Sequence, residues 1–266
     1  MRGRVLIIAG SDSGGGAGIQ ADIKTVSMLD AYAATAITAL TAQNTEGVFG
    51  VLPIPPEFVR QQIEVVLDDI GADAIKTGML HDLPVIEAIA ATLHERATGI
   101  PLVVDPVMVA KGGAQLIDPA ALEGLKRLLI ARAEIVTPNL PEAEILCGRA
   151  IGNVAEMRAA GEVLLALGCR SVLVKGGHLS GEIVSDVLVR AAGARVWETP
   201  RLVTRHTHGT GCTLASAIAA GLAQGMAVET AVDRARAYVQ RAIAGAPGFG
   251  RGHGPLDHSH PLHSLP

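Results

Sequence analysis

The chain has few aromatic residues and no long stretch of positive charge, and both absences limit what it can bind. Aromatic side chains make up 2% of the 266 residues and stand singly along the sequence. Single-stranded nucleic acid is usually bound by stacking its bases on such side chains, so this class of partner is disfavoured. Lys and Arg total 22 against 26 Asp and Glu, for a formal net charge of −4, and basic residues never form the clusters typical of nucleic-acid binding proteins. We therefore expect a small-molecule partner and no nucleic acid.

Cysteine and long apolar runs are also scarce. The three cysteines, Cys147, Cys169 and Cys212, include no Cys-x-x-Cys pair. Such an odd, widely spaced set indicates neither a disulfide framework nor a structural zinc site. No apolar run approaches the roughly 18 residues that span a bilayer, and the N-terminal run at 5–9 is too short for the core of a signal peptide. We expect a cytoplasmic protein with no membrane partner.

Apolar residues (49%) and glycine (31 residues) are plentiful, and the apolar runs follow a regular rhythm. Short runs that are apolar throughout alternate with longer segments of helical periodicity. Such strands are typical of a sheet whose two faces are covered by helices, and the alternation predicts a mainly parallel α/β sheet. The expected strands are 4–9, 34–41, 74–77, 102–105, 134–137 and 171–175; the expected helices are 19–29, 56–70, 83–96, 119–129, 141–146, 154–167, 213–224 and 228–244.

The last third of the chain bears on domain organisation. Residues 185–200 predict a β-hairpin at one edge of the sheet. No linker or repeat divides the chain, so we expect a single domain over residues 1–266. Residues 247–266 contain Gly, Pro and four histidines, which are compatible with a metal-binding tail or with a loosely ordered terminus. We favour the loosely ordered terminus.

Four polar, glycine-containing or proline-containing segments follow the predicted strands, and they are the best candidates for a site. In an open parallel sheet the carboxyl ends of the strands meet at one crevice, where ligands bind. The first segment holds five glycines but matches neither the dinucleotide fingerprint nor a P-loop. Glycines this dense indicate close approach of the backbone to a ligand or to another segment. The four segments are 10–18, 105–108, 137–142 and 208–212.

Segment 208–212, His-Gly-Thr-Gly-Cys, precedes a helix of small apolar residues. The N–H groups at such a helix start, together with the helix dipole, favour an anion such as a phosphate. The same dipole would favour the thiolate of Cys212, although a small buried apolar side chain is an equal alternative. Lys175 ends a strand and suits a nucleotide phosphate. Asp105 and Glu142 follow two other strands and could hold Mg²⁺ beside phosphate oxygens, or serve as ordinary helix-start acids.

Seven motifs, in order along nearly the whole chain, resemble hydroxymethylpyrimidine/phosphomethylpyrimidine kinase, the thiamine-biosynthesis branch of the ribokinase-like superfamily. The resemblance implies a three-layer α/β/α sandwich with a central, mostly parallel sheet, and a homodimer. It also implies two ATP-dependent steps at one site, from 4-amino-5-hydroxymethyl-2-methylpyrimidine to its monophosphate and then to the diphosphate. The motifs are IAGSDSGGGAGIQADIKT (8–25), ALTAQN (39–44), KTGML (76–80), DPVMVAK (105–111), TPNLPEA (137–143), KGGH (175–178) and THGTGC (207–212).

For the acceptor, the resemblance implies that Asp22 and Gln43 hydrogen-bond the aminopyrimidine and that Gly10 and Met79 line its pocket. Gln43 suits this task because its amide offers a donor and an acceptor, which match a ring nitrogen beside an exocyclic amine. Ordinary structural interpretations also stand: a first-turn helix acid for Asp22, a loop hydrogen bond for Gln43, and core filling for Met79.

For the transfer itself, Cys212 stands where the superfamily's Gly-Ala-Gly-Asp motif has its catalytic Asp. The resemblance therefore implies that Cys212 is the general base toward the substrate hydroxyl. Gly209, Thr210 and Gly211 would form the anion hole for the transferring phosphoryl group. Lys175 would contact the ATP phosphates, and the two acids named above would help to hold Mg²⁺. The role of the histidine before Gly209 stays open.

Two other functions remain open. Some members of this branch phosphorylate pyridoxal, whose aldehyde can form a thiohemiacetal with a cysteine near the site. Here Cys147 and Cys169 lie far from every motif, which favours the pyrimidine. A non-catalytic pyrimidine-binding protein would be expected to have lost Lys175, Cys212 or the anion-hole glycines, and all of these are present.

Overall fold

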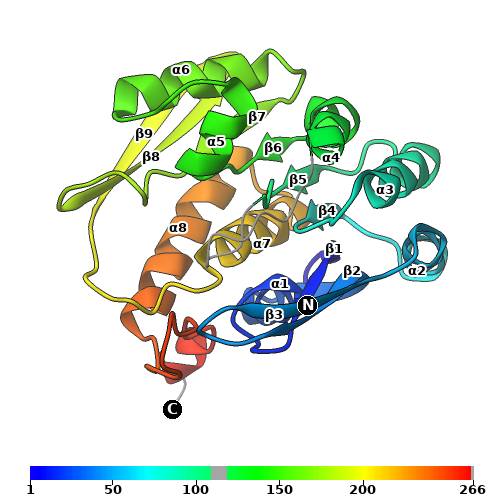
Figure 1. Ribbon diagram of the computed structural model, residues 1–266, viewed down its shortest axis with the longest axis horizontal. Helices are drawn as coiled ribbons and strands as arrows, with labels where there is room; N and C mark the ends of the chain where they lie inside the picture. The colour runs from blue at the N-terminus through cyan, green and yellow to red at the C-terminus, as the bar shows by residue number, and fades with distance from the viewer. Residues whose placement is uncertain (109–118, 265–266) are drawn as a thin grey trace.

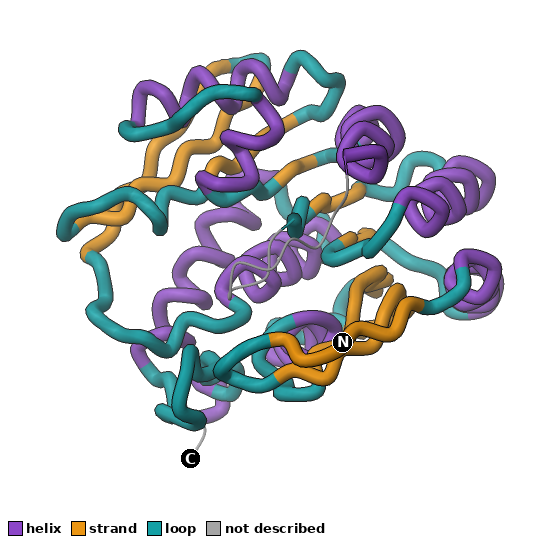
Figure 2. Tube along the Cα trace, viewed as in Figure 1, coloured by secondary structure: helices purple, strands orange, loops and turns teal. Residues whose placement is uncertain are grey.

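The computed structural model describes residues 1–108 and 119–264, which form a nine-stranded sheet with helices on both faces (Figures 1 and 2). The strand order is β3-β2-β1-β4-β5-β6-β7-β8-β9. Neighbours from β2 to β7 are parallel, whereas the pairs β2–β3, β7–β8 and β8–β9 are antiparallel. The strands are β1 Arg4–Asp12, β2 Tyr32–Gln43, β3 Val48–Pro53, β4 Ala74–Thr77, β5 Leu102–Val104, β6 Ile135–Val136, β7 Ser171–Val174, β8 Ile183–Arg190 and β9 Gly193–Pro200.

The interior strand β1 shows why helices cover both faces. Leu6 and Ile8 pack into one core with α2 to α6, while Val5 and Ile7 pack into a second core with α1, α7 and α8. All four side chains are fully buried, and each contributes about 1.5–3 kcal/mol to the free energy of unfolding. This arrangement confirms the mainly parallel α/β sheet and the edge hairpin (β8 and β9) that the sequence predicts, and the three-layer sandwich that the resemblance implies. The helices are α1 Gly18–Met28, α2 Pro56–Asp69, α3 Leu83–Arg96, α4 Pro119–Gly124, α5 Leu140–Cys147, α6 Val154–Leu165, α7 Thr210–Ala223 and α8 Val228–Ala244.

Side-chain caps fix where three of the described helices begin, among them α3 and α5. At α3, the Asp82 carboxylate accepts the N–H of Val85 at 3.0 Å. At α5, Asn139 accepts the N–H of Glu142 at 2.9 Å, and Glu142 accepts the N–H of Asn139 at 2.8 Å. Because Glu142 lies in the first turn of α5, this capping box holds its carboxylate at the carboxyl end of β6.

Three elements differ from the sequence-based expectation. Strand β1 continues to Asp12, so the glycine-rich segment begins as β structure. The sequence does not predict β3, because this edge strand contains glycine and proline and its side chains are mostly exposed, which removes the apolar pattern. The helix predicted over 119–129 consists of α4 and a π-helical turn at Leu125–Leu129.

The C-terminal residues pack against the rest of the protein, unlike the loosely ordered tail that composition predicts. Leu256 and His258 are only 4% and 5% exposed. The N–H of Asp257 donates to the carbonyl of Ala242 near the end of α8, at 2.9 Å. The prediction of a loosely ordered terminus is therefore corrected for the described part of this segment.

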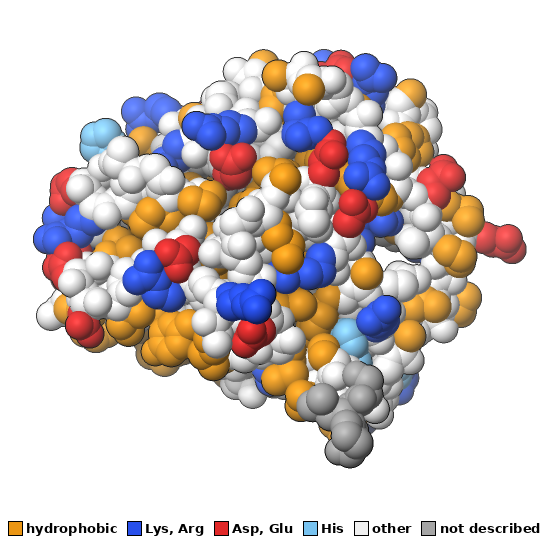
Figure 3. Space-filling model, turned by 180° about the vertical axis from the view of Figure 1, so that it is seen from behind, with side chains coloured by type: hydrophobic (Ala, Val, Ile, Leu, Met, Phe, Trp, Pro, Cys, Tyr) orange, Lys and Arg blue, Asp and Glu red, His pale blue; other side chains and the backbone are white. Residues whose placement is uncertain are grey.

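The surface carries charges of both signs. Figure 3 shows basic and acidic side chains interspersed over the rear face, in agreement with the small net charge. Within residues 1–108 and 119–264, the helices are too short or too polar to cross a membrane.

Candidate active site

A cavity of about 510 Å³ opens where the carboxyl ends of the parallel strands meet the first turn of α7. All four polar segments contribute to its walls, as the strand order predicts. Asp22, another predicted site residue, does not line the cavity, and Val109–Lys111 of one motif lie outside the described residues. The predicted site residues that line the cavity are Gly10, Gln43, Met79, Asp105, Glu142, Lys175, Gly209, Thr210, Gly211 and Cys212.

The structure places Asp22 in a buried ion pair behind the cavity wall. Its side chain is fully buried, lies 2.8 Å from Nζ of Lys76, and accepts a hydrogen bond from Oγ of Ser216 at 2.6 Å. Lys76, which the sequence analysis does not single out, lines the cavity although its side chain is fully buried too. Asp22 therefore pairs with Lys76 at the cavity, and its contact with the acceptor stays a prediction.

The Lys76 ammonium and the Cys212 thiol influence each other. Burial lowers the pKa of Lys76, but the Asp22 carboxylate raises it by more, so the ammonium stays charged. Burial raises the pKa of Cys212 to about 12, although the Lys76 charge and a hydrogen bond from the backbone of Gly18 lower it. The helix dipole, which we expect to favour the Cys212 thiolate, is thus opposed by burial, which favours the protonated thiol.

Helix α7 begins at the predicted anion hole. Gly209 is the N-cap with φ of +84°, and a Cβ at this position would lie 1.8 Å from the carbonyl oxygen of Gly16. Both facts require glycine. The Thr210 hydroxyl donates to the carbonyl of Thr207 at 2.8 Å, which leaves the backbone to face the cavity. First-turn N–H groups have no acceptor within their own helix, so residues 209–211 can offer theirs to an anion, although the N–H of Thr210 already makes a long 3.4 Å hydrogen bond to the carbonyl of Thr207.

Lys175 lies beside this anion hole in a buried charged cluster. Its Nζ is 3.0 Å from Oδ1 of Asp105, and a Cβ on Gly211 would lie 3.1 Å from the same Nζ. Burial lowers the pKa of Lys175, but Asp105 and Glu142 raise it by more, so the ammonium stays charged. Burial raises the pKa of Glu142 to about 7, with Asp105 adding to the rise and Lys175 opposing it.

The two carboxylates of this cluster fit a Mg²⁺ ion that also binds phosphate oxygens. Asp105 uses Oδ1 to accept from Lys175 and from Thr137, and Glu142 uses Oε2 to cap α5. Each carboxylate has a second oxygen, and Mg²⁺ takes one or two carboxylates beside water and phosphate. No group of three or more His, Cys, Asp or Glu side chains in the described ranges could hold a metal ion alone. A metal here would therefore need the phosphates, and the metal-binding tail gains no support.

Gly10, Met79 and Gln43 form the predicted acceptor wall. A Cβ on Gly10 would lie 2.4 Å from Cε of Met79, so the glycine lets the thioether lie flat against β1. Gln43 ends β2 and contacts two neighbours through its amide. Its Oε1 lies 3.2 Å from Oγ1 of Thr41, and its Nε2 lies 3.3 Å from Nε2 of His208.

Asp12, which the sequence analysis assigns no role, organises the glycine-rich segment. Its carboxylate accepts the backbone N–H groups of Gly14 (2.8 Å), Gly16 (3.1 Å) and Ala17 (2.8 Å), and it lies 2.8 Å from Nε2 of His208. Burial raises the pKa of Asp12, but these partners together lower it by more. An acidic residue two positions before a run of glycines is the sequence signal for such an arrangement.

Known proteins resemble this chain in sequence and in structure. Residues 12–257 match the family model for phosphomethylpyrimidine kinase. The chain is 46% identical to the hydroxymethylpyrimidine/phosphomethylpyrimidine kinase of Bacillus subtilis, over 96% of this chain and 94% of that protein. It is 52% identical to the thiamine biosynthesis bifunctional protein ThiED of Geobacter sulfurreducens over 97% of this chain, but spans only 52% of that longer protein. The ADP complex of Bacillus subtilis pyridoxal kinase is structurally similar, with a TM-score of 0.91, 38% identity, and coverage of 97% and 98%. Together with the motifs in order, these matches confirm that the chain belongs to the phosphomethylpyrimidine kinase family.

Proposed function

We propose that this chain transfers the γ-phosphoryl group of ATP to 4-amino-5-hydroxymethyl-2-methylpyrimidine, and then a second phosphoryl group to the resulting monophosphate. The diphosphate is the form used in thiamine biosynthesis. One observation carries the proposal: the anion hole of α7, Lys175 and Cys212 open into the same cavity as Gln43 and Met79. Donor phosphates and a small flat acceptor therefore meet in one place, and the family membership supports this pairing.

On the acceptor side, Gln43 recognises the aminopyrimidine through its amide, which offers a donor and an acceptor side by side. The Met79 thioether, held flat against Gly10, supplies an apolar wall for the ring. Any side chain at Gly10 would push Met79 into the space that the ring needs.

On the donor side, Lys175 and the N–H groups of residues 209–211 stabilise the charge on the transferring phosphoryl group. Phosphoryl transfer depends mainly on positioning and on charge stabilisation by groups fixed in advance. Asp105 fixes Lys175 at 3.0 Å, and the close packing of Gly209 on Gly16 fixes the start of α7.

Cys212 is the proton acceptor for the hydroxyl group in the first step. Its thiolate form, which the Lys76 ammonium favours, takes the hydroxyl proton as the oxygen bonds to phosphorus and ADP leaves. Because burial holds the pKa near 12, this form is scarce at neutral pH. The chemistry therefore relies more on charge stabilisation than on the strength of the base.

Asp105 and Glu142 would hold Mg²⁺ together with the ATP phosphates. The ion supplies positive charge that offsets the charge of the phosphates during transfer. The side chains already face Lys175, so the cluster can accept a cation only when phosphate oxygens bring further negative charge.

We also propose a homodimer that forms through the edge strand β3. Phe49 and Leu52 on this strand are 72% and 62% exposed, which is unusual for large apolar side chains on an unpaired sheet edge. Sedimentation equilibrium should give twice the chain mass, and Phe49→Ser with Leu52→Ser should shift it to the chain mass. A wild-type protein at the chain mass would contradict this proposal.

A cytoplasmic location is the further proposal that the cysteines support. Cys147, Cys169 and Cys212 are all free thiols, the state that a reducing compartment maintains.

Pyridoxal kinase is the second candidate activity, because the structure of such an enzyme has a TM-score of 0.91 to this chain. Two observations favour the pyrimidine. The chain is more similar in sequence to the pyrimidine kinase, at 46% against 38% identity. In addition, Cys147 and Cys169 do not line the cavity, and the Cys169 thiol donates to the carbonyl of Leu164.

Rates of ADP release with the two acceptors test the proposed function. We expect kcat/KM to be at least about tenfold higher for the pyrimidine alcohol than for pyridoxal, since one pocket contact discriminates by about that factor. A higher value for pyridoxal would establish the second candidate. Release with neither acceptor would indicate the non-catalytic pyrimidine-binding protein.

A further inference from the structure

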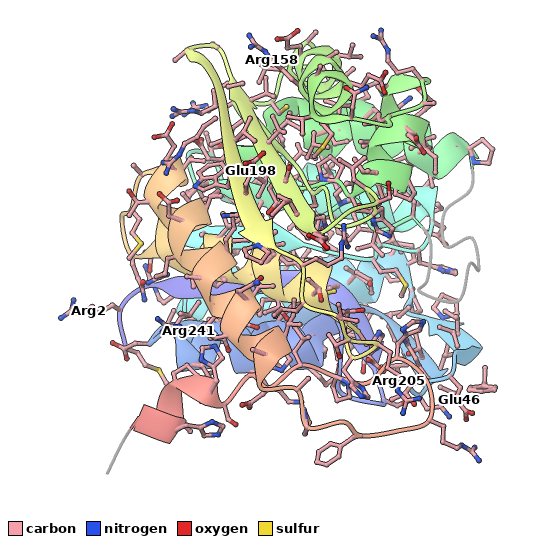
Figure 4. The ribbon with its side chains drawn as sticks, turned by 90° about the vertical axis from the view of Figure 1, so that its left-hand side faces the viewer. Arg2, Glu46, Arg158, Glu198, Arg205 and Arg241 are labelled. Carbon is pink, nitrogen blue, oxygen red and sulfur yellow. The ribbon has the colours of Figure 1, made fainter. Side chains whose placement is uncertain are left out.

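The segment after α8 lies against the mouth of the active site, although it does not line the cavity. We call residues 250–258 the C-terminal strap. In Figure 1 the chain after α8 turns back beside the β2–β3 turn, and in Figure 4 it passes close to Glu46 and Arg205. The strap makes three separate contacts with parts of the protein that carry site residues.

The first contact is with the β2–β3 turn, which follows Gln43. The carbonyl of Thr45 accepts the N–H of His253 at 2.8 Å, and its hydroxyl accepts the N–H of Gly252 at 3.2 Å. Arg251 also pairs with Glu46 at 3.0 Å, although both side chains are too exposed for this pair to contribute much. The two backbone-mediated bonds therefore tie the turn to the strap.

The second contact is with His208, the residue before the anion hole. Its N–H donates to the carbonyl of Gly254 at 3.1 Å, and it pairs with Pro255 in a short parallel bridge. The side chain of the same histidine lies 2.8 Å from Asp12 and 3.3 Å from Gln43. The strap thus fixes the backbone of the residue that links the glycine-rich segment to the acceptor wall.

The third contact is with the first turn of α7. Nε2 of His258 lies 3.0 Å from Oγ1 of Thr213, and both residues are buried. The hydroxyl of Tyr238, a residue of α8, donates to the carbonyl of His258 at 2.7 Å, so α8 also fixes the position of the histidine. Burial lowers the pKa of His258 to about 4, so the ring is neutral near pH 7.

The glycines of the strap are required by close packing rather than by flexibility. A Cβ on Gly252 would lie 2.0 Å from the carbonyl oxygen of Thr45, and a Cβ on Gly254 would lie 2.2 Å from Nδ1 of His206. Real Cβ atoms do not approach so closely, so with a side chain at Gly252 the strap could not lie on the turn, and with one at Gly254 it could not lie beside His206. The glycine content of the strap, which by composition indicates disorder, allows it to pack closely against these residues.

We propose that the C-terminal strap positions the acceptor side of the active site by holding the β2–β3 turn and His208 in fixed relation to each other. The strap residues are positioning residues, because they act through Gln43 and His208 rather than on substrate. This inference rests on the proposed function for its kinetic consequence only. Loss of the strap contacts should weaken acceptor binding and turnover and affect ATP binding less, since Lys175 and Asp105 take no part in the three contacts described above and are fixed by each other.

The main test compares Gly252→Ala with Gly47→Ala. The added methyl group at Gly252 must displace the Thr45 carbonyl, whereas a Cβ on Gly47, in the same turn, meets nothing within 4 Å. Displacing a site by about 1 Å can cost on the order of 100-fold in rate. We expect Gly252→Ala to raise the KM for the pyrimidine by about tenfold or more, with the KM for ATP changed less than about twofold. Gly47→Ala should match the wild type. Equal changes in both KM values, or none in a folded Gly252→Ala, would overturn the proposal.

Amide hydrogen exchange provides a readout that does not depend on the identity of the acceptor. In Gly252→Ala, residues 44–47 and 207–209 should exchange faster, while strand β5 at the centre of the sheet should keep its protection. If the wild type phosphorylates no acceptor but this exchange pattern appears, the proposed function is contradicted and the positioning role of the strap is supported. Unchanged exchange at both segments would refute the positioning role of the strap.

A second pair of variants covers the case in which Gly252→Ala fails to fold. Thr213→Val keeps the shape of the side chain but removes the partner of His258, whereas Thr213→Ser keeps the hydroxyl. Thr213→Val should raise the acceptor KM and Thr213→Ser should restore it toward the wild-type value. Identical acceptor KM values in the two variants would contradict the role of this contact.

Discussion

Replacement of Cys212 by alanine should affect the two phosphorylation steps unequally. In the first step the acceptor is an alcohol, which must lose a proton as its oxygen attacks phosphorus. In the second step the acceptor is a phosphate, whose second pKa is about 6, so its oxygen is already ionised near pH 7. Only the first step therefore needs a proton acceptor, and Cys212 lines the cavity directly after the last residue of the anion hole.

The size of the effect follows from the state of the thiol. With a pKa of about 12, the Cys212 thiolate amounts to about one molecule in 10⁵ at pH 7 and about one in 10³ at pH 9. Raising the pH removes the thiol proton, so the first step should accelerate by about tenfold per pH unit in this range, while the second step stays nearly flat. A positioned general base contributes about 10²–10⁴-fold, so Cys212→Ala should slow the first step by about that factor and the second by less than about tenfold.

The assay measures ADP release with the alcohol and with the monophosphate as separate acceptors between pH 7 and pH 9. Cys147→Ala is the matched control, because this thiol is also free but does not line the cavity. A Cys212→Ala variant in which both steps fall by the same factor would refute the reasoning, and so would a first step that is independent of pH.

Three further variants test other parts of the site. Asp22→Asn removes the counter-charge of the buried Lys76, so the free energy of unfolding in urea should fall by about 3–5 kcal/mol; a fall of less than about 1 kcal/mol would mean that the pair is not needed. Gln43→Ala should raise the KM for the pyrimidine and leave that for ATP unchanged, and equal changes would contradict the assigned pocket. Glu142→Gln tests the raised pKa. Because the pKa in the folded state is about 7 against an ordinary 4.5, the contribution of Glu142 to stability is present below about pH 4.5 and is lost as the pH rises through 7. The free energy of unfolding of the wild type should therefore fall relative to Glu142→Gln across this range, and parallel curves would argue against it.

The sequence predicts most of the fold because its elements carry strong local signals. Strand Ala74–Thr77 and helices Leu83–Arg96 and Val228–Ala244 begin and end as predicted. Each apolar run is bounded by a turn, and α3 has a capping aspartate at its start. The cavity is predicted for a different reason: parallel strands bring their carboxyl ends to one edge, so distant motifs must meet there.

At the site and in the strap, what the sequence does not predict depends on partners that are distant in sequence. Asp22 and Lys76 are 54 positions apart, and neither residue alone indicates that they form a buried pair. The pKa of Cys212 depends on burial beside that pair, which outweighs the helix dipole that the sequence shows. The ordered packing of the strap is not predicted for a similar reason. Glycine can indicate either a flexible backbone or a close contact, and only the position of Thr45 against Gly252 shows which of the two applies.

The most direct test of the account is a time course of products from the pyrimidine alcohol and Mg-ATP, followed by phosphorus NMR, with pyridoxal in a parallel reaction. The account predicts that the monophosphate appears first and is converted to the diphosphate, while pyridoxal is phosphorylated slowly. Accumulation of the monophosphate without diphosphate, or faster phosphorylation of pyridoxal, would contradict it.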